Sequence, residues 1–252
     1  MCLFEHPTSY SEMCKKIAQS VFFISLIEIF LLAQISPDFA QMLKKLSFNT
    51  ETELLNIKLY ISYIYIPLIL SLLENIFKMH DVIGRLFGIR IRNAATVIFP
   101  TYIIELNIKT SKSKKEIQKA YTNNKSLQYE VGNHFYHHVS YSDPLIDKHE
   151  VSMALDAWTW FWISLDTFCI TLVFLLGVVA FNIFGALKSC LLIVGLCFYL
   201  FGVALIGYLV LKIRCSRYTK REIRAAIKYD QEKNKGTLNN NLKEKINDAL
   251  SC

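Results

Sequence analysis

The sequence lacks the short motifs by which common enzyme classes are recognised. It contains no glycine-rich phosphate loop of the GxGxxG or GxxxxGK[ST] type, no GxSxG nucleophile motif and no HExxH zinc motif. Ser164 and Asp166 are two residues apart, so on a helix they point in different directions and cannot act as a catalytic pair. We therefore expect neither an enzymatic activity nor a cofactor.

Paired cysteines and abundant charge are absent as well. The seven cysteines show no CxxC spacing, and several lie in strongly apolar stretches, where they act as small apolar side chains rather than as disulfide partners or zinc ligands. Only 19% of the residues are charged, whereas 53% are hydrophobic, and the mean hydropathy is +0.30. This composition argues against an ordinary soluble domain.

What the chain does have is a long apolar region from Trp158 to Ile213. No charge interrupts it between Asp166 and Lys188, or between Lys188 and Lys212. Each half exceeds the roughly 18–20 residues that cross a ~30 Å hydrocarbon core, and neither half carries the polar stripe of a soluble helix. We predict a transmembrane hairpin, with the three tryptophans at its start in an interfacial belt.

Two further spans are predicted nearer the N-terminus, at Ile17–Ile35 and at Leu59–Phe77, the second with Pro67 near its middle. Between them, residues 38–48 place Phe39, Met42, Leu43 and Leu46 on one helical face, which favours a helix at the membrane surface or against a neighbouring subunit. The apolar run at residues 94–107 is too short for a span, so a strand or an interfacial segment is expected there.

The resulting fold class is an all-α polytopic membrane protein with four transmembrane helices and a cytosolic α+β insertion between spans two and three. The expected division is a cytosolic N-terminus (1–16), a first transmembrane hairpin (17–77), a cytosolic domain (78–155), a second hairpin (156–213) and a basic cytosolic tail (214–252).

Charge distribution predicts the orientation. The N-terminal segment, the long insertion and the chain from Lys212 onward together hold 24 of the 28 Lys and Arg residues, and the two remaining loops hold four. Because basic loops stay on the cytoplasmic side, we expect a multi-pass protein of the cell inner membrane with both termini in the cytoplasm.

Three acids fall within or at the edge of the predicted spans: Glu28, Glu74 and Asp166. A charge near the bilayer centre costs on the order of 2.5–3.5 kcal/mol, so these side chains should avoid lipid. They could line a cation pathway in an oligomer, or they could form structural hydrogen bonds between helices, and Glu74 could simply lie at the interface. We expect a homo-oligomer, with a tetramer as the favoured form.

Basic residues cluster beside the spans. Arginine forks match phosphate oxygens, so these residues could bind an anionic nucleotide or oligonucleotide; they could equally hold topology and contact anionic lipid. The candidate ligand-binding residues are Arg85, Arg90, Arg92, Arg217, Lys220, Arg221 and Arg224. Histidines 134, 137, 138 and 149 are expected to be ordinary residues of a folded surface rather than metal ligands, and no metal site is predicted.

The stretch HDVIGRLFGIRIR, from His80 to Arg92 directly after a span, resembles a motif of small four-span proteins from bacterial anti-phage operons. The layout of two helical hairpins around a cytosolic middle domain is similar to the Hailong-like channel subunits, and the phage-sensing subunits of the Kiwa type have a similar span count. The resemblance implies a homotetrameric channel controlled by an oligonucleotide that a cytosolic partner enzyme makes. The alternative is a non-conducting sensor or scaffold that recruits a cytosolic defence enzyme.

Overall fold

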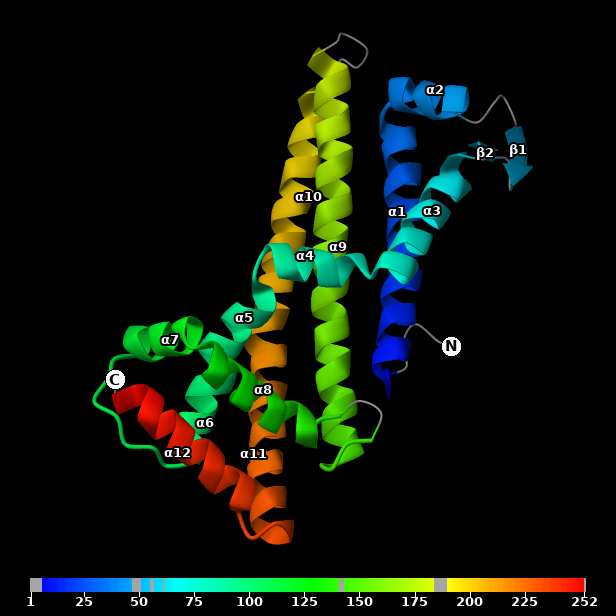
Figure 1. Ribbon diagram of the computed structural model, residues 1–252. Helices are drawn as coiled ribbons and strands as arrows, with labels where there is room; N and C mark the ends of the chain where they lie inside the picture. The colour runs from blue at the N-terminus through cyan, green and yellow to red at the C-terminus, as the bar shows by residue number, and fades with distance from the viewer. Residues whose placement is uncertain are drawn as a thin grey trace. The chain divides into compact units, whose positions relative to one another are not determined.

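Helices make up most of the structure, a computed structural model that describes residues 6–46, 51–54, 57–60, 62–140, 143–183 and 190–251 (Figure 1). The helices are α1 (Tyr10–Ile35), α2 (Pro37–Leu46), α3 (Ser62–Phe77), α4 (Met79–Leu86), α5 (Ile89–Asn93), α6 (Phe99–Glu105), α7 (Lys114–Asn123), α8 (Lys125–His138), α9 (Lys148–Ile183), α10 (Cys190–Leu209), α11 (Ser216–Lys233) and α12 (Thr237–Ser251). Two π-helical turns, η1 (Ala94–Ile98) and η2 (Val210–Cys215), continue into α6 and α11. A short antiparallel hairpin joins β1 (Glu51–Leu54) to β2 (Ile57–Tyr60), with Glu51 opposite Tyr60.

The chain divides into two compact units. Unit 1 contains residues 14–82 and 159–210, and unit 2 contains residues 6–13, 83–158 and 211–252. The tail and all of the insertion from residue 83, which the sequence suggested as separate segments, therefore belong to the same unit.

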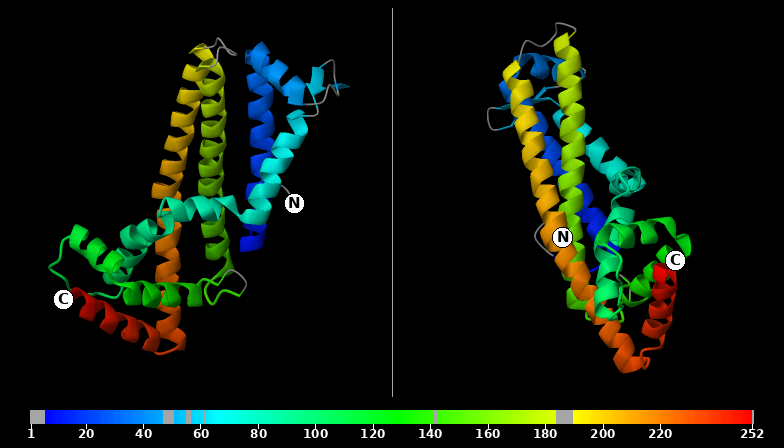
Figure 2. Two further views of the ribbon diagram at one scale, coloured as in Figure 1. Left: turned by 45° about the horizontal axis from the view of Figure 1, so that its top comes forward. Right: turned by 90° about the vertical axis from the view of Figure 1, so that its left-hand side faces the viewer.

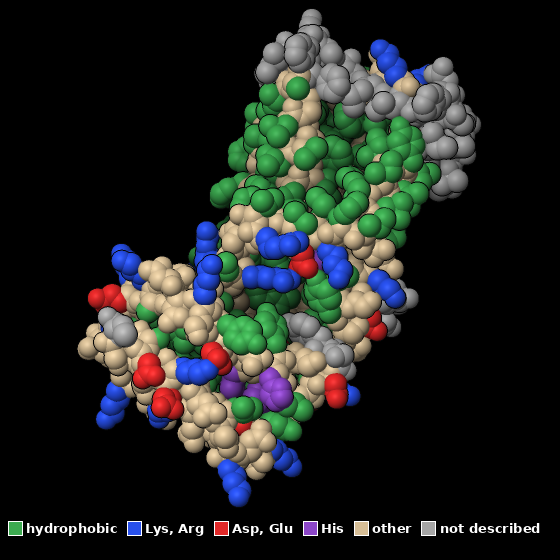
Figure 3. Space-filling view, viewed as in Figure 1, with side chains coloured by type: hydrophobic (Ala, Val, Ile, Leu, Met, Phe, Trp, Pro, Cys, Tyr) green, Lys and Arg blue, Asp and Glu red, His purple; other side chains and the backbone are tan. Residues whose placement is uncertain are grey.

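Unit 1 contains most of the apolar helical segments. Three helices are long and apolar enough to cross a membrane, namely Tyr10–Ile35, Lys148–Ala180 and Leu191–Lys233, and Ser62–Phe77 is a shorter apolar helix. α9 and α10 run side by side in every view (Figure 2). Their outer surfaces are hydrophobic, as are those of the neighbouring helices, and form the green band of Figure 3. The three long helices have the length and the composition of membrane spans.

The second predicted span begins later than expected. The sequence suggested Leu59 as its first residue, but β2 extends to Tyr60 and α3 begins at Ser62. The amphipathic helix predicted after the first span is present as α2, and its Phe39 and Leu43 are buried in unit 1 against α1 and its neighbours.

The β content predicted for the insertion is wrong. Residues 78–140 and 143–155 contain helices and connecting turns, without a strand, and the only hairpin in the described residues lies in the first loop. The apolar run at 94–107 is helical because Phe99, Tyr102, Ile103 and Leu106 fall on one face and are all buried. Pro100 lies in the first turn of α6, directly after the π-helical turn η1, where the regular helical hydrogen-bond pattern is already interrupted.

The tail consists of two helices separated by a short turn. α11 ends at Lys233, Gly236 in the turn has a φ of +73°, and the asparagines at 239–241 lie inside α12. Asn239 is buried, and its side chain donates a hydrogen bond to the carbonyl of Ile227 at 2.9 Å, while its backbone N–H donates to Asp230 at 2.9 Å. These bonds join α11 to α12 and explain why a polar residue belongs there.

Candidate functional site

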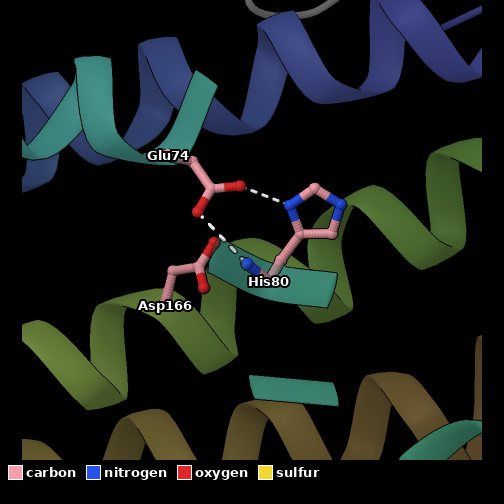
Figure 4. Close-up of side chains that lie close together, drawn as sticks. All are labelled: Glu74, His80 and Asp166. Atoms are coloured by element: carbon pink, nitrogen blue, oxygen red, sulfur yellow. Dashed lines mark hydrogen bonds and ion pairs between the residues drawn. The ribbon is translucent and has the colours of Figure 1, made fainter. Parts of the chain in front are cut away.

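Three polar side chains meet in the interior of unit 1: Glu74 from α3, His80 from α4 and Asp166 from α9 (Figure 4). Their exposed fractions are 3%, 0% and 3%. Glu74 Oε1 contacts His80 Nδ1, and the backbone N–H of His80 donates to Glu74 Oε2 at 3.2 Å. One potential ligand atom from each residue lies within 4.8 Å of the other two. We refer to these residues as the Glu74–His80–Asp166 cluster.

A sharp turn between α3 and α4 creates this arrangement. Lys78 adopts a left-handed conformation with a φ of +47°, and its carbonyl accepts a 2.8 Å hydrogen bond from the N–H of Asp81. The left-handed residue ends α3 and redirects the chain, as glycine commonly does at the end of a helix. As a result, His80 turns back towards Glu74, six residues earlier.

The surroundings of His80 fix its ring. The Trp162 ring lies 5.6 Å away, centroid to centroid, and the Cys14 thiol hydrogen-bonds to the imidazole. Burial alone would lower the pKa of His80, but the hydrogen bonds with Cys14 and Glu74, together with the charges of Glu74 and Asp81, raise it to about 9. His80 therefore carries a proton at neutral pH and is the electrostatic partner of Glu74.

Asp166 has a different status. Neither of its carboxylate oxygens has a hydrogen-bond partner among the described residues, although both are buried. The side chain nevertheless points towards Glu74 and His80 rather than away from them (Figure 4). An acid that is buried without a hydrogen bond is costly, so its retention in this position calls for an explanation.

Glu28, the third predicted acid, is not part of the cluster. It lies on α1, where its Oε1 accepts a 2.7 Å hydrogen bond from Thr171 of α9, and the Tyr199 hydroxyl of α10 is a second partner. The structure thus brings two of the three predicted acids together and places the third in a bond between helices. All three are buried, which agrees with the expectation that they avoid lipid.

Sequence reasoning missed His80. The signal was a histidine three residues after the end of a span and six after an intramembrane acid, but helical spacing does not bring those positions together. Only the left-handed turn at Lys78 does.

A second candidate site lies on the surface of unit 2. A hollow of about 360 Å³ follows one face of α11 and is lined by Lys212, Ile213, Ser216, Arg217, Lys220, Arg221 and Arg224. It contains all four predicted ligand-binding residues of the tail. We call it the α11 basic hollow.

The remaining basic residues lie elsewhere. Arg85 is on α4, and Arg90 and Arg92 are on α5; all three are exposed, and none lines the hollow. Arg214, which shares a helical face with the tail arginines if the helix is regular, instead belongs to η2 and pairs with Asp156 at 3.4 Å.

The histidines of α8 form structural contacts. His134 lies 2.9 Å from the Tyr102 hydroxyl and 3.1 Å from Asn239 Oδ1, so one residue connects α8 to α6 and α12. Burial and the neighbouring His138 lower the pKa of His134 to about 4, so it is neutral at physiological pH. Burial also raises the pKa of Tyr102 far above its usual value.

Comparison with known proteins places the chain in a family. The model of the YmfE protein family matches residues 9–240, which covers nearly all of both units. The chain belongs to the YmfE protein family. No curated protein and no solved structure matches it.

Within this YmfE-family chain, the two sites have opposite chemistry. The α11 basic hollow presents positive charge to solvent and suits a multiply charged anion. The Glu74–His80–Asp166 cluster presents two carboxylates and an imidazole inside an apolar unit and suits a cation.

Proposed function

We propose that this protein is a homo-oligomeric channel subunit of the bacterial inner membrane, gated by an anionic nucleotide or oligonucleotide. The observation that carries the proposal is the α11 basic hollow, whose lining contains five Lys and Arg side chains and no acidic one. Arg224 lies at its edge, where Nε donates to Glu105 at 2.7 Å. In an oligomer, several such hollows would concentrate positive field around one axis and favour a polyanion.

The contacts within unit 2 support four crossings. His6 Nδ1 lies 3.3 Å from Asp156, and the Ser152 hydroxyl donates to the carbonyl of Pro7 at 3.1 Å. Residues before α1 therefore touch residues that follow α3. If α1 crosses the membrane, the chain must return before residue 152, and α3 is the apolar helix that can return it.

The same argument supports the orientation. The segments that assemble into unit 2 are those predicted to be cytoplasmic from their Lys and Arg content. With α1, α3, α9 and α10 as spans, unit 2 and both termini lie in the cytoplasm. α3 has 16 residues, about 24 Å of helix, so local thinning of the bilayer accompanies its crossing.

In this proposal the described conformation is closed. Asp166, Glu28 and Glu74 are enclosed within one chain, so they can line a cation pathway only after α1, α3 and α9 move apart. A ligand at the α11 basic hollow shifts that equilibrium only by its difference in affinity for the closed and open forms. The physiological role that fits is defence against phage by depolarisation, with the ligand supplied by a cytosolic partner enzyme.

A second function is a non-conducting sensor or scaffold that recruits a cytosolic enzyme. It is favoured by the burial of all three acids and by the two tyrosines that α8 exposes, Tyr129 at 71% and Tyr136 at 54%. Exposed aromatic side chains are common in protein interfaces.

One experiment separates these functions. Purified protein in liposomes is tested for cation flux and, by fluorescence anisotropy, for binding of a labelled short single-stranded oligonucleotide. We expect binding that weakens with salt, with a log–log slope near −0.7 per phosphate neutralised. Arg217→Glu with Arg221→Glu should weaken binding by at least ~10-fold, because each reversal replaces an attraction with a repulsion.

The matched control is Lys114→Glu with Lys115→Glu on α7, which changes the same charge at exposed positions outside the hollow. An equal loss of oligonucleotide binding in both double variants would mean that the hollow is not a specific binding site and that only the overall positive charge matters. Binding without any flux would favour the sensor, and the absence of binding would overturn ligand gating altogether.

A further inference from the structure

We propose that the Glu74–His80–Asp166 cluster is a binding site for a divalent transition-metal cation, of the Zn²⁺ or Mn²⁺ class. The proposal does not depend on conduction or on a ligand at the α11 basic hollow. It rests on the geometry of three side chains from three helices of unit 1 (Figure 4).

The unpartnered acid is the first argument. Asp166 is 3% exposed, and both of its oxygens lack a hydrogen-bond partner in the described part of the chain, yet the carboxylate faces the other two members. A bound cation would coordinate those oxygens and would remove the cost of burying them bare. The two bonds that His80 makes in the cluster, from its backbone N–H and at Nδ1, both go to Glu74, so they do not satisfy the oxygens of Asp166.

Charge balance is the second argument. As metal ligands, the two carboxylates and a neutral imidazole would carry a charge of −2, which a divalent cation neutralises. Without a metal, His80 is the electrostatic partner of Glu74 alone, whereas a divalent cation would compensate both carboxylates.

The donor set selects the class of ion. Imidazole together with carboxylates suits Zn²⁺, Mn²⁺ and similar ions, whereas Ca²⁺ and Mg²⁺ prefer oxygen ligands alone. In a tetrahedral site with bonds of about 2.0–2.1 Å, ligand atoms lie roughly 3.3–3.4 Å apart, so atoms that are within 4.8 Å need only small side-chain rotations to close around an ion. Three protein ligands leave one position open for water or another ligand.

The neighbours of the cluster support a preorganised site. Trp162 packs on His80, and the Cys14 thiol hydrogen-bonds to it, so α1 and α9 both hold the imidazole in place. Partners in this outer layer orient ligands and commonly change metal affinity by about 10–100-fold when they are lost.

The test is a metal-binding titration of the full chain in detergent, after removal of bound metal with a chelator. Isothermal titration calorimetry with Zn²⁺ and with Mn²⁺ should show one saturable site per chain, and Mg²⁺ and Ca²⁺ should bind at least ~10-fold more weakly. Asp166→Asn keeps the shape but removes the charge, and it should weaken binding by at least ~10-fold, the smallest effect expected from losing a direct ligand.

Glu28→Gln is the matched control, because Glu28 is a buried acid of the same unit that lies outside the cluster. It should bind metal as the unmodified protein does. Size-exclusion chromatography checks that each variant is folded. If Asp166→Asn does not fold, His80→Asn serves as the second cluster variant. Absence of saturable binding, or the same affinity in a folded cluster variant and in the unmodified protein, overturns the proposal.

Discussion

The two units of this chain place polar and apolar groups in opposite ways. In unit 1, large apolar side chains face outward, such as Phe198 at 74% and Val173 at 66% exposure, while Glu28, Glu74 and Asp166 are inside. In unit 2, Phe99 and Ile223 are fully buried, and charged side chains of both signs are scattered over the outside (Figure 3).

This difference follows from two solvents. In lipid, an exposed apolar side chain costs nothing and an exposed charge is expensive, whereas in water the apolar side chain must be buried. Unit 2 also pairs many of its buried polar groups, as His134 shows with Tyr102 and Asn239. Substitutions that remove a buried apolar side chain from unit 2, or that place a charge on the surface of unit 1, test this explanation.

The largest effect is expected from Phe99→Ala in unit 2. Phe99 is fully buried and lies 4.9 Å from the Tyr121 ring, centroid to centroid, so its truncation leaves a cavity at the contact of η1, α6 and α7. The free energy of unfolding of unit 2 should fall by about 3–5 kcal/mol. Limited proteolysis across a temperature series would measure the change.

The control for this variant is Phe198→Ala in α10, where the ring is exposed on unit 1. Because lipid or detergent covers the ring before and after the change, the stability of the protein should change little. If both variants destabilise equally, Phe198 is buried in a contact between chains.

A charge on the surface of unit 1 should have the next largest effect. Val173 is exposed in the middle of the apolar part of α9, and Val173→Arg should cost about 2.5–3.5 kcal/mol of insertion free energy. The fraction of protein recovered in membranes measures this cost. Tyr129→Arg on α8 is the control, and as a surface change of unit 2 it should stay within about 0.5 kcal/mol. Normal membrane recovery of the Val173 variant would mean that this face contacts water or protein.

Much of the fold could be predicted because apolar runs have a direct physical meaning in a membrane. The uninterrupted apolar runs lie in the long helices α1, α9 and α10, and two of these begin well before the run, α1 at Tyr10 and α9 at Lys148. The run at 94–107 was assigned wrongly because its length and its proline were weighed above its helical spacing, which puts Phe99, Tyr102 and Ile103 on one buried face.

The candidate site was predicted only in part. Glu74 and Asp166 could be identified because an acid within an apolar helix is rare and seldom faces lipid. The contact between these two acids could not be predicted, because it depends on how α3 packs against α9. His80 could not be found either, since it reaches Glu74 through a left-handed Lys78, a conformation that no lysine signals in a sequence.

The smallest of these effects concerns a buried acid of unit 2, Glu222 on α11. It is 2% exposed, and its Oε1 has no hydrogen-bond partner among the described residues. Burial, together with the charge of Glu150, raises the pKa of Glu222 well above its usual value. In the folded state the side chain therefore holds its proton at pH values where the unfolded chain has already released it.

The sign of the pH dependence follows. An acid whose folded pKa is raised contributes most to stability below its unfolded pKa of about 4.5, and this contribution is lost as the pH rises through the folded pKa. Glu222→Gln removes the titration, so it should stabilise unit 2 at alkaline pH relative to the unmodified protein. The gain should shrink as the pH approaches 5.

Thermal unfolding of both proteins between pH 5 and pH 9 measures this difference. Glu116→Gln on α7 is a control of opposite sign, because hydrogen bonds from Ser113 lower the pKa of Glu116 and the exposed carboxylate completes the capping box of that helix. Its removal should destabilise the helix at neutral and alkaline pH and matter less in acid. A stability difference for Glu222→Gln that does not change with pH would show that Glu222 stays ionised in the fold through a partner outside the single chain.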